Sequence, residues 1–296
     1  MRDDTSSAVQ RLLILRQHPG FADADLGELA TMAENLVETV FPAGAIVATP
    51  ESRVAALHLV VEGRLETARR VQAQSAWDAH QVFGVLEVIA GRPVQAPVIA
   101  AVETRTLQLC AADLAEILED NFGLLSNARR GIARNLLASK LRRGIATWPR
   151  PAQVIVPRSP GLVEQLIVLR QQLPFARMQA LAALAQAAVE VTFEPGEVIR
   201  EAGAHADGAF VILDGMARTY RDSEHVLVPN DSIGWLETIA EREHGTTTTA
   251  VTRTRVLRVP SIALFDVMED HTDLALAMIT RLAGELLDQL DTDDVN

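Results

Sequence analysis

The chain has 296 residues, and its 48% hydrophobic and 22% charged content is that of folded domains rather than of a disordered segment. Its formal net charge of −12 argues against a protein built to neutralise nucleic-acid phosphates. The lone Cys110 excludes an internal disulfide, and no apolar run approaches the roughly 18 residues of a membrane span.

The first predicted element is a helix, followed by a series of strands. The helix is indicated by apolar residues at helical spacing, namely Leu26, Leu29, Met32 and Leu36. Short segments rich in Val, Ile and Thr come next, and the Gly, Pro and Asp residues between them are typical of tight turns. Gly63 is expected where one strand reverses into the next, because such turns need a positive φ. An amphipathic helix over about 124–141 closes the series.

The same series occurs a second time at an offset near 150 residues. Residues 41–47 (FPAGAIV) return as 193–199 (FEPGEVI), and 83–90 (FGVLEVIA) return as 233–240 (IGWLETIA). Residues 114–120 (LAEILED) return as 264–270 (LFDVMED). Ordered matches at nearly constant spacing indicate a duplication.

We therefore predict two copies of one domain. The first copy covers residues 1–143 and the second residues 162–296, and the Pro-rich segment 144–161 is predicted to link them. The predicted fold class is mainly β with flanking helices: two tandem jelly-roll-like β-rolls, each with N- and C-terminal α-helices.

The two copies resemble the cyclic-nucleotide-binding domain family, which includes the catabolite activator proteins and the regulatory subunits of cyclic-nucleotide-dependent kinases. The resemblance rests on a Pro/Gly turn before a strand (F-P-A-G in the first copy, F-E-P-G in the second), the apolar strand ending in (E/D)-G, and the (F/I)-G segment, in this order in both copies. It implies a ligand cassette, F-G-E-L-A followed by P-R-A-A/S-T. In that cassette the Glu accepts a hydrogen bond from the ribose hydroxyl, and the Arg pairs with the cyclic phosphate.

Neither copy keeps the two ligand residues of that cassette. The Glu position falls on Val85 and Trp235, and the Arg position falls on Val94 and His244. Valine offers only an apolar surface to a phosphate, which leaves the anion without a partner. The resemblance therefore implies the fold more strongly than it implies cyclic-nucleotide binding.

An altered ligand pocket is the second interpretation of these segments. Its candidate ligand-binding residues are Glu237, His244, Thr246, Thr247 and Glu87. His244 can contribute a charge when protonated, and the threonines offer hydroxyl donors. We expect no cofactor; if a cyclic AMP or cyclic GMP site survives, we expect it in the second copy. Glu87 with Arg92, and Glu237 with Arg242, form either an altered ligand site or surface ion pairs.

The C-terminal helix of the first copy is the candidate interface. Leu136 and Leu137 are expected to pack on the domain's own roll, or against a second subunit in a homodimer. Arg129 and Arg130 belong to a basic stripe that either faces solvent or docks on an acidic partner, such as the other domain.

The main functional hypothesis is a non-enzymatic regulatory or adaptor protein that acts on a protein partner. The alternative is a small-molecule sensor that binds a cyclic nucleotide or another anion in an altered pocket, mainly in the second copy. The seven histidines are scattered and no catalytic motif occurs, so we expect neither an enzyme nor a metal site. We expect no nucleic-acid binding, because an acidic tail follows the last helix, and no membrane insertion. The polar N-terminus favours a cytoplasmic location.

Overall fold

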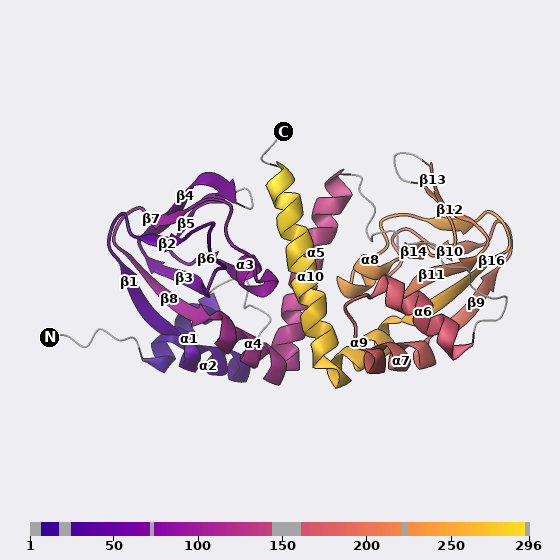
Figure 1. Cartoon of the computed structure of the whole chain (residues 1–296), viewed down its shortest axis with the longest axis horizontal. Helices are drawn as coiled ribbons and strands as arrows, with labels where there is room; N and C mark the ends of the chain where they lie inside the picture. Colours follow the sequence, from indigo (N-terminus) through magenta and orange to yellow (C-terminus); the bar gives the residue numbers. More distant parts are fainter. Residues whose placement is uncertain (1–6, 18–24, 72–73, 144–160, 221–223, 294–296) are drawn as a thin grey trace. The chain divides into compact units, whose positions relative to one another are not determined.

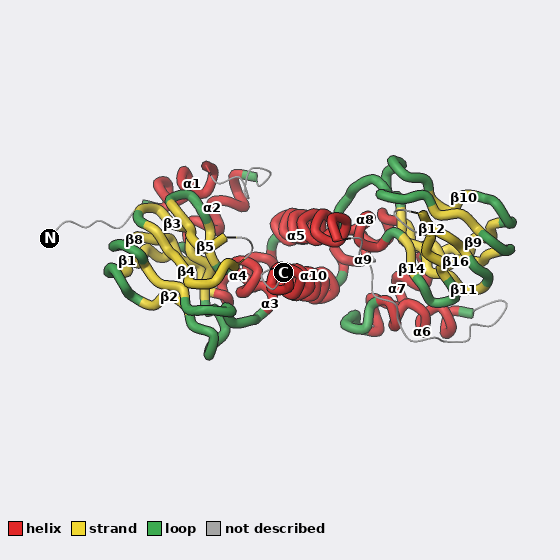
Figure 2. The backbone as a smooth tube through the Cα atoms, turned by 90° about the horizontal axis from the view of Figure 1, so that it is seen from above, coloured by secondary structure: helices red, strands yellow, loops and turns green. Residues whose placement is uncertain are grey.

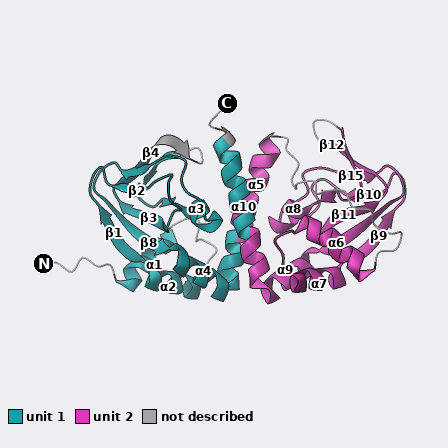
Figure 3. Cartoon of the chain, viewed as in Figure 1, with its two compact units in different colours: residues 1–128, 279–296 teal, residues 129–278 magenta. Residues whose placement is uncertain are grey.

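The computed structural model describes residues 7–17, 25–71, 74–143, 161–220 and 224–293 (Figure 1). The predicted linker, apart from Gly161, lies outside the described residues. Contacts divide the chain into two compact units, residues 1–128 with 279–296 and residues 129–278 (Figure 3). Each boundary falls inside a long helix, α5 (Phe122–Arg143) or α10 (Thr272–Asp293). The predicted domains, 1–143 and 162–296, follow the sequence repeat and not the contacts between residues, and these domain bounds stay a prediction.

The first unit contains two four-stranded antiparallel sheets. One sheet has the order β1 (Val37–Phe41), β8 (Thr104–Cys110), β3 (Ala56–Glu62), β6 (Val82–Phe83). The other has the order β2 (Ile46–Ala48), β7 (Val98–Ala100), β4 (Arg64–Val71), β5 (Gln74–Asp78).

The second unit repeats this topology with its own strands. One sheet has the order β9 (Val189–Phe193), β16 (Thr254–Pro260), β11 (Gly208–Asp214), β14 (Ser232–Ile233). The other has the order β10 (Val198–Arg200), β15 (Thr248–Ala250), β12 (Ala217–Tyr220), β13 (Glu224–Leu227). The two units therefore place corresponding strands at corresponding positions.

Helices flank the strands of each unit (Figure 2). The first unit contains α1 (Ala8–Gln17), α2 (Leu26–Asn35), α3 (Val85–Ala90) and α4 (Ala111–Asp120). The second contains α6 (Leu162–Gln172), α7 (Met178–Ala187), α8 (Trp235–Ile239) and α9 (Ser261–Asp270). The predicted fold class, mainly β with flanking helices, is confirmed. Among the described residues no helix combines the length and the apolar character needed to cross a membrane.

Helix α2 shows how local sequence sets an element. Asp25 and Glu28 form a capping box, in which the Asp25 carboxylate accepts a hydrogen bond from the Glu28 N–H at 2.8 Å and Glu28 accepts one from the Asp25 N–H. Leu29 and Met32 are buried as expected, whereas Leu26 is 59% exposed because it lies on the outer side of the first turn.

Gly63 occupies the predicted strand reversal, and Gly215 occupies the corresponding turn of the second unit. Their φ angles are +89° and +88°, a region that favours glycine. An added Cβ would lie 2.6 Å from the Glu103 carbonyl oxygen at Gly63 and 2.4 Å from the Arg253 carbonyl oxygen at Gly215. These two turns therefore require glycine for both conformation and space.

One difference between the cores of the two rolls lies at His58. In the first, His58 is 4% exposed and lies against the rings of Phe41 and Phe83 at centroid distances of 5.6 Å and 6.0 Å. In the second, Phe210 holds the matching position, because His58 pairs with Phe83 and Phe210 with Ile233 in the same register. His58 is therefore part of the core of the first roll.

Candidate functional site

The cassette segment of each copy forms a short helix that begins at a glycine. Gly84 and Gly234 precede α3 and α8 with φ of +89° and +82°. At Gly234 an added Cβ would lie 3.2 Å from the Gly208 carbonyl oxygen and 3.2 Å from the His244 ring. The positive φ and this close approach explain why the position requires glycine.

The four residues at the cassette's Glu and Arg positions offer no charge to a phosphate. Trp235 is fully buried, and Val94 is 2% exposed. His244 is 4% exposed, and its Nδ1 atom has no hydrogen-bond partner. Burial, together with the positive charge of Arg200, lowers the pKa of His244 below its usual 6.5. The imidazole is therefore neutral at pH 7, so the predicted contribution of a protonated His244 is not favoured by its surroundings.

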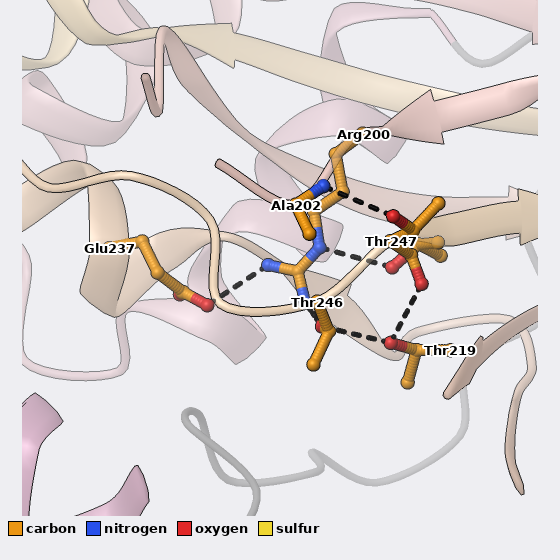
Figure 4. Close-up of polar contacts among 7 residues, drawn as sticks. Arg200, Ala202, Thr219, Glu237, Thr246 and Thr247 are labelled. Atoms are coloured by element: carbon orange, nitrogen blue, oxygen red, sulfur yellow. Dashed lines mark hydrogen bonds and ion pairs between the residues drawn. The ribbon is translucent and has the colours of Figure 1, made fainter. Parts of the chain in front are cut away.

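Arg200, at the end of β10, is the cation of this region, and the sequence interpretation missed it. Its side chain is 8% exposed, and its Nη1 atom lies 3.0 Å from Oε1 of Glu237, which is 2% exposed. Nη2 donates to the Thr246 hydroxyl at 2.8 Å, and Nε donates to the Thr248 hydroxyl at 3.0 Å. Figure 4 shows the guanidinium between the carboxylate and the threonines.

The threonines form a second layer around Arg200. The Thr219 hydroxyl donates to the Thr246 hydroxyl at 2.9 Å and also reaches the Thr247 carbonyl oxygen (Figure 4). The Thr247 hydroxyl accepts a hydrogen bond from the Ala202 N–H at 3.1 Å. The structure thus brings Glu237, Thr246 and Thr247 together around one guanidinium, and each nitrogen of that guanidinium has an acceptor within the protein.

The sequence pattern does not single out Arg200. It follows Val198 and Ile199 directly after the P-G turn, and strand periodicity places it on the same side as Val198, which is half exposed. Its pairing with Thr248 instead follows a register shift between Val198 and Arg200. Such a bulge redirects side chains and cannot be located from the sequence pattern.

The first unit has the carboxylate without the guanidinium. Ala48 pairs with Val98 across the same register shift that pairs Arg200 with Thr248. Glu87 is 2% exposed, and its Oε2 atom has no hydrogen-bond partner. Thr67, which corresponds to Thr219, is buried, and its hydroxyl also has no partner.

Arg92 does not form the suggested pair with Glu87. Its guanidinium instead donates to Asp288 at 2.5 Å and to the Gly284 carbonyl oxygen at 3.3 Å, both in α10. Burial raises the pKa of Glu87, and a hydrogen bond with its own backbone N–H opposes this shift. Asp291 raises the pKa further through repulsion, and Arg92 lowers it. Arg242 of the second unit is exposed, while Glu237 pairs with Arg200. In both units the Glu is therefore buried and its expected arginine lies elsewhere.

The candidate interface residues of α5 lie mostly inside the structure. Arg129 is 3% exposed, donates to the Ile239 carbonyl oxygen at 2.7 Å and pairs with Glu241 at 2.8 Å. Its guanidinium also lies 4.4 Å from the centre of the Phe265 ring. Arg130 is partly exposed and pairs with Glu241 at 3.3 Å.

Leu136 and Leu137 are 1% and 5% exposed. Arg129 pairs with Glu241 within the second unit, and docking of the basic stripe on an acidic partner stays a prediction. The described residues contain no group of three or more His, Cys, Asp or Glu side chains that could hold a metal ion.

Residues 190–271 match a protein family described as the cyclic nucleotide-binding domain. This segment runs from β9 to the end of α9 and includes the Arg200 network. No curated protein matches the chain.

Several solved structures are similar to the chain. The regulatory domain of Toxoplasma gondii PKA, solved with cAMP, is 17% identical over 99% of this chain and 98% of its own, with a TM-score of 0.37. The regulatory subunit of a cAMP-independent protein kinase A from Trypanosoma brucei is 16% identical over 92% and 89%, with a TM-score of 0.37. A cyclic nucleotide-binding-like protein from Brucella abortus is 20% identical over 36% and 98%, with a TM-score of 0.33.

Proposed function

We propose that this chain, whose residues 190–271 belong to the cyclic nucleotide-binding domain family, is a non-enzymatic regulatory or adaptor protein that has lost cyclic-nucleotide binding and acts through protein–protein contacts. The proposal includes a cytoplasmic location, a protein partner, and no binding of nucleic acid. The observation that carries it is the Arg200–Glu237 ion pair in the second roll.

The ion pair opposes a cyclic phosphate in two ways. Arg200 already has a carboxylate and two hydroxyls as acceptors, so a phosphate would have to displace Glu237. The displaced carboxylate would then stay buried without a counter-charge, which costs several kcal/mol. His244, at the family's Arg position, is neutral and cannot compensate.

The first roll is no more favourable to an anion. Val94 replaces the phosphate-binding Arg, and the buried Glu87 would repel a phosphate. Both rolls thus keep the cassette glycine, which serves the backbone, while their charged residues suit an anion poorly.

Contacts with a protein are supported by exposed apolar side chains that recur in both units. Val9, Leu13 and Leu26 are 64%, 54% and 59% exposed, and Val163, Ile167 and Met178, at the matching positions of α6 and α7, are 65%, 45% and 57% exposed. Exposed apolar groups that recur in this way favour a binding role over chance. A homodimer through the C-terminal helices stays a prediction, and sedimentation of the full chain over a range of concentrations tests it.

Calorimetric titration of the full chain with cyclic AMP, cyclic GMP and cyclic dinucleotides tests the loss of binding. We expect no saturable heat for any of them, and saturable binding at micromolar concentration would overturn the proposal. A triple variant that restores the family pattern, Trp235→Glu with Glu237→Ala and His244→Arg, is expected to gain cyclic AMP binding. Glu243→Gln is the matched control, because it raises the net charge by one, as the triple variant does, at an exposed neighbouring residue.

A sensor for a small anion is the second candidate, and the threonine layer around Arg200 favours it. Thr219, Thr246 and Thr247 place three hydroxyls near a guanidinium, a donor set that suits an oxyanion if Glu237 is displaced. Binding of a cyclic nucleotide or inorganic phosphate that is lost in Arg200→Ala would support this candidate over the first.

A further inference from the structure

We propose that the first β-roll binds a small organic cation of the guanidinium or primary-amine class, with the Glu87 carboxylate as its counter-ion. The cation would lie where the second roll places the guanidinium of Arg200. This inference goes beyond the proposed function, which concerns the loss of an anionic ligand and contacts with a protein.

The strand register makes the two positions equivalent. Arg200 and Ala48 each end a three-residue strand and pair, after the same register shift, with Thr248 and Val98. Glu237 and Glu87 are each the third residue of the short helix that follows the cassette glycine. The first roll thus has the carboxylate position of the ion pair and a methyl group where the arginine side chain begins.

Two buried side chains of the first roll each have a polar atom without a hydrogen-bond partner. Glu87 is 2% exposed and Thr67 is 7% exposed, and neither Glu87 Oε2 nor the Thr67 hydroxyl has a hydrogen bond. In the second roll the corresponding Thr219 donates to Thr246, which accepts from Arg200. A buried carboxylate without a counter-charge is unfavourable, and a bound cation with N–H donors removes this penalty.

The charges around Glu87 also favour a cation. The negative charge of Asp291 raises the pKa of Glu87, in addition to the effect of burial. Arg92, whose positive charge lowers this pKa, is itself paired with Asp288. The matching helix position in the second unit is Leu141, whose Cδ2 atom would lie 3.5 Å from a Cβ at Gly245. An acidic residue therefore stands at this position only in the unit that lacks the internal arginine.

The geometry of the second roll indicates the chemical class of the cation proposed for the first roll. There the carboxylate binds a planar group whose other nitrogens donate to hydroxyls. A guanidinium fits a carboxylate through its forked N–H donors, and a primary ammonium offers three donors on a point charge.

Calorimetric titration of the full chain with N-methylguanidinium and with agmatine tests the proposal, and urea is the matched neutral probe. We expect saturable binding of at least one cation and none of urea. Glu87→Gln should weaken binding by about tenfold or more, because it removes the charged acceptor. Glu62→Gln, the loss of an exposed carboxylate in the same unit, should leave binding unchanged.

A second variant keeps the test independent of the folding of Glu87→Gln. Ala48→Arg supplies the first roll with the side chain that the second roll has, and it is expected to abolish cation binding while leaving the chain folded. Absence of saturable binding by both cations would overturn the proposal. Binding that is equal in wild type, Glu87→Gln and Ala48→Arg would overturn it too, because the cation would then bind elsewhere.

Discussion

Arg200 and Glu237 form an ion pair of 3.0 Å inside the second roll, and neither side chain is more than 8% exposed. The pair joins the strand that follows the P-G turn to the helix that follows the cassette glycine. Its threonine partners complete a polar network in a region that the family resemblance assigns to a ligand. The network is both a structural element of the roll and an obstacle to an anion.

Removing Arg200 should destabilise the second unit strongly. In Arg200→Ala the Glu237 carboxylate stays buried without its partner, and we expect a loss of about 3 kcal/mol in the free energy of unfolding. Urea unfolding of the full chain, followed by circular dichroism, measures this. Arg218→Ala is the matched control, since the Arg218–Glu224 pair is 58% and 54% exposed and should contribute less than about 1 kcal/mol. Equal effects of the two variants would contradict a buried, structurally important pair.

Replacing both partners should cost much less than replacing one. Arg200→Met combined with Glu237→Leu leaves no unpaired charge, so we expect most of the lost stability to return. A double-mutant cycle isolates the coupling between the two residues. Additive losses would show that the two side chains act independently.

The stability of the first unit should fall as the pH is lowered, because His58 is buried and neutral. Burial lowers the pKa of His58 to about 4, from 6.5 when it is exposed. Between these values the unfolded chain binds the proton and the folded chain does not, so stability is fully present above pH 6.5 and declines towards pH 4. The full loss is roughly 3 kcal/mol.

The second roll suggests the variant that removes this dependence. His58 meets the Thr106 hydroxyl at 3.3 Å, and the matching positions hold Phe210 and Val256. His58→Phe with Thr106→Val should flatten the pH profile of thermal unfolding between pH 6.5 and pH 4. His225→Gln, at an exposed residue, is the control that should keep the wild-type profile. A profile that is unchanged in the double variant would assign the dependence to other groups.

Glu87 should make the first unit less stable as the pH rises. Its pKa is raised in the folded state by burial and by Asp291, so the folded chain holds the proton to a higher pH than the unfolded chain does. Stability is thus greatest below the ordinary Glu pKa and declines as the pH rises towards the raised value. Glu87→Gln should stabilise the chain at pH 7 and change little near pH 4, as thermal unfolding at both values would show. A destabilised variant at pH 7 would mean that the carboxylate has a favourable partner.

Arg129 should hold the end of α5 within the second unit. Arg129→Met removes a hydrogen bond to the Ile239 carbonyl oxygen and a partly buried ion pair with Glu241, and we expect a loss of about 2 kcal/mol. Hydrogen exchange of residues 129–143 and 239–241 would report the faster local opening. Arg130→Met is the control, because the Arg130 side chain is 28% exposed and its pair is longer. Similar exchange in the two variants would contradict a special role for Arg129.

The sequence by itself determined the fold of this protein. Helical spacing predicted α2, although Leu26 proved exposed, and Gly63 and Gly215 marked strand reversals that no other residue fits. Two ordered sets of turn and strand signals predicted the two rolls, because a turn that needs a particular φ angle selects glycine or proline at that position. The same comparison located Glu87 and Glu237 and the replacements at His244 and Val94.

Only the tertiary structure decided what those residues do. Glu237 pairs with Arg200, which lies 37 residues earlier, and a register shift in β10 brings the two together. Arg92 pairs with Asp288, 196 residues away, and not with the nearby Glu87. Charge partners depend on which side chains the fold buries side by side, and the energy of a charge depends on that burial. The spacing of residues in the sequence gives neither the partner of a charged side chain nor its burial. The sequence therefore located the carboxylates, and the fold determined which of them has a counter-charge.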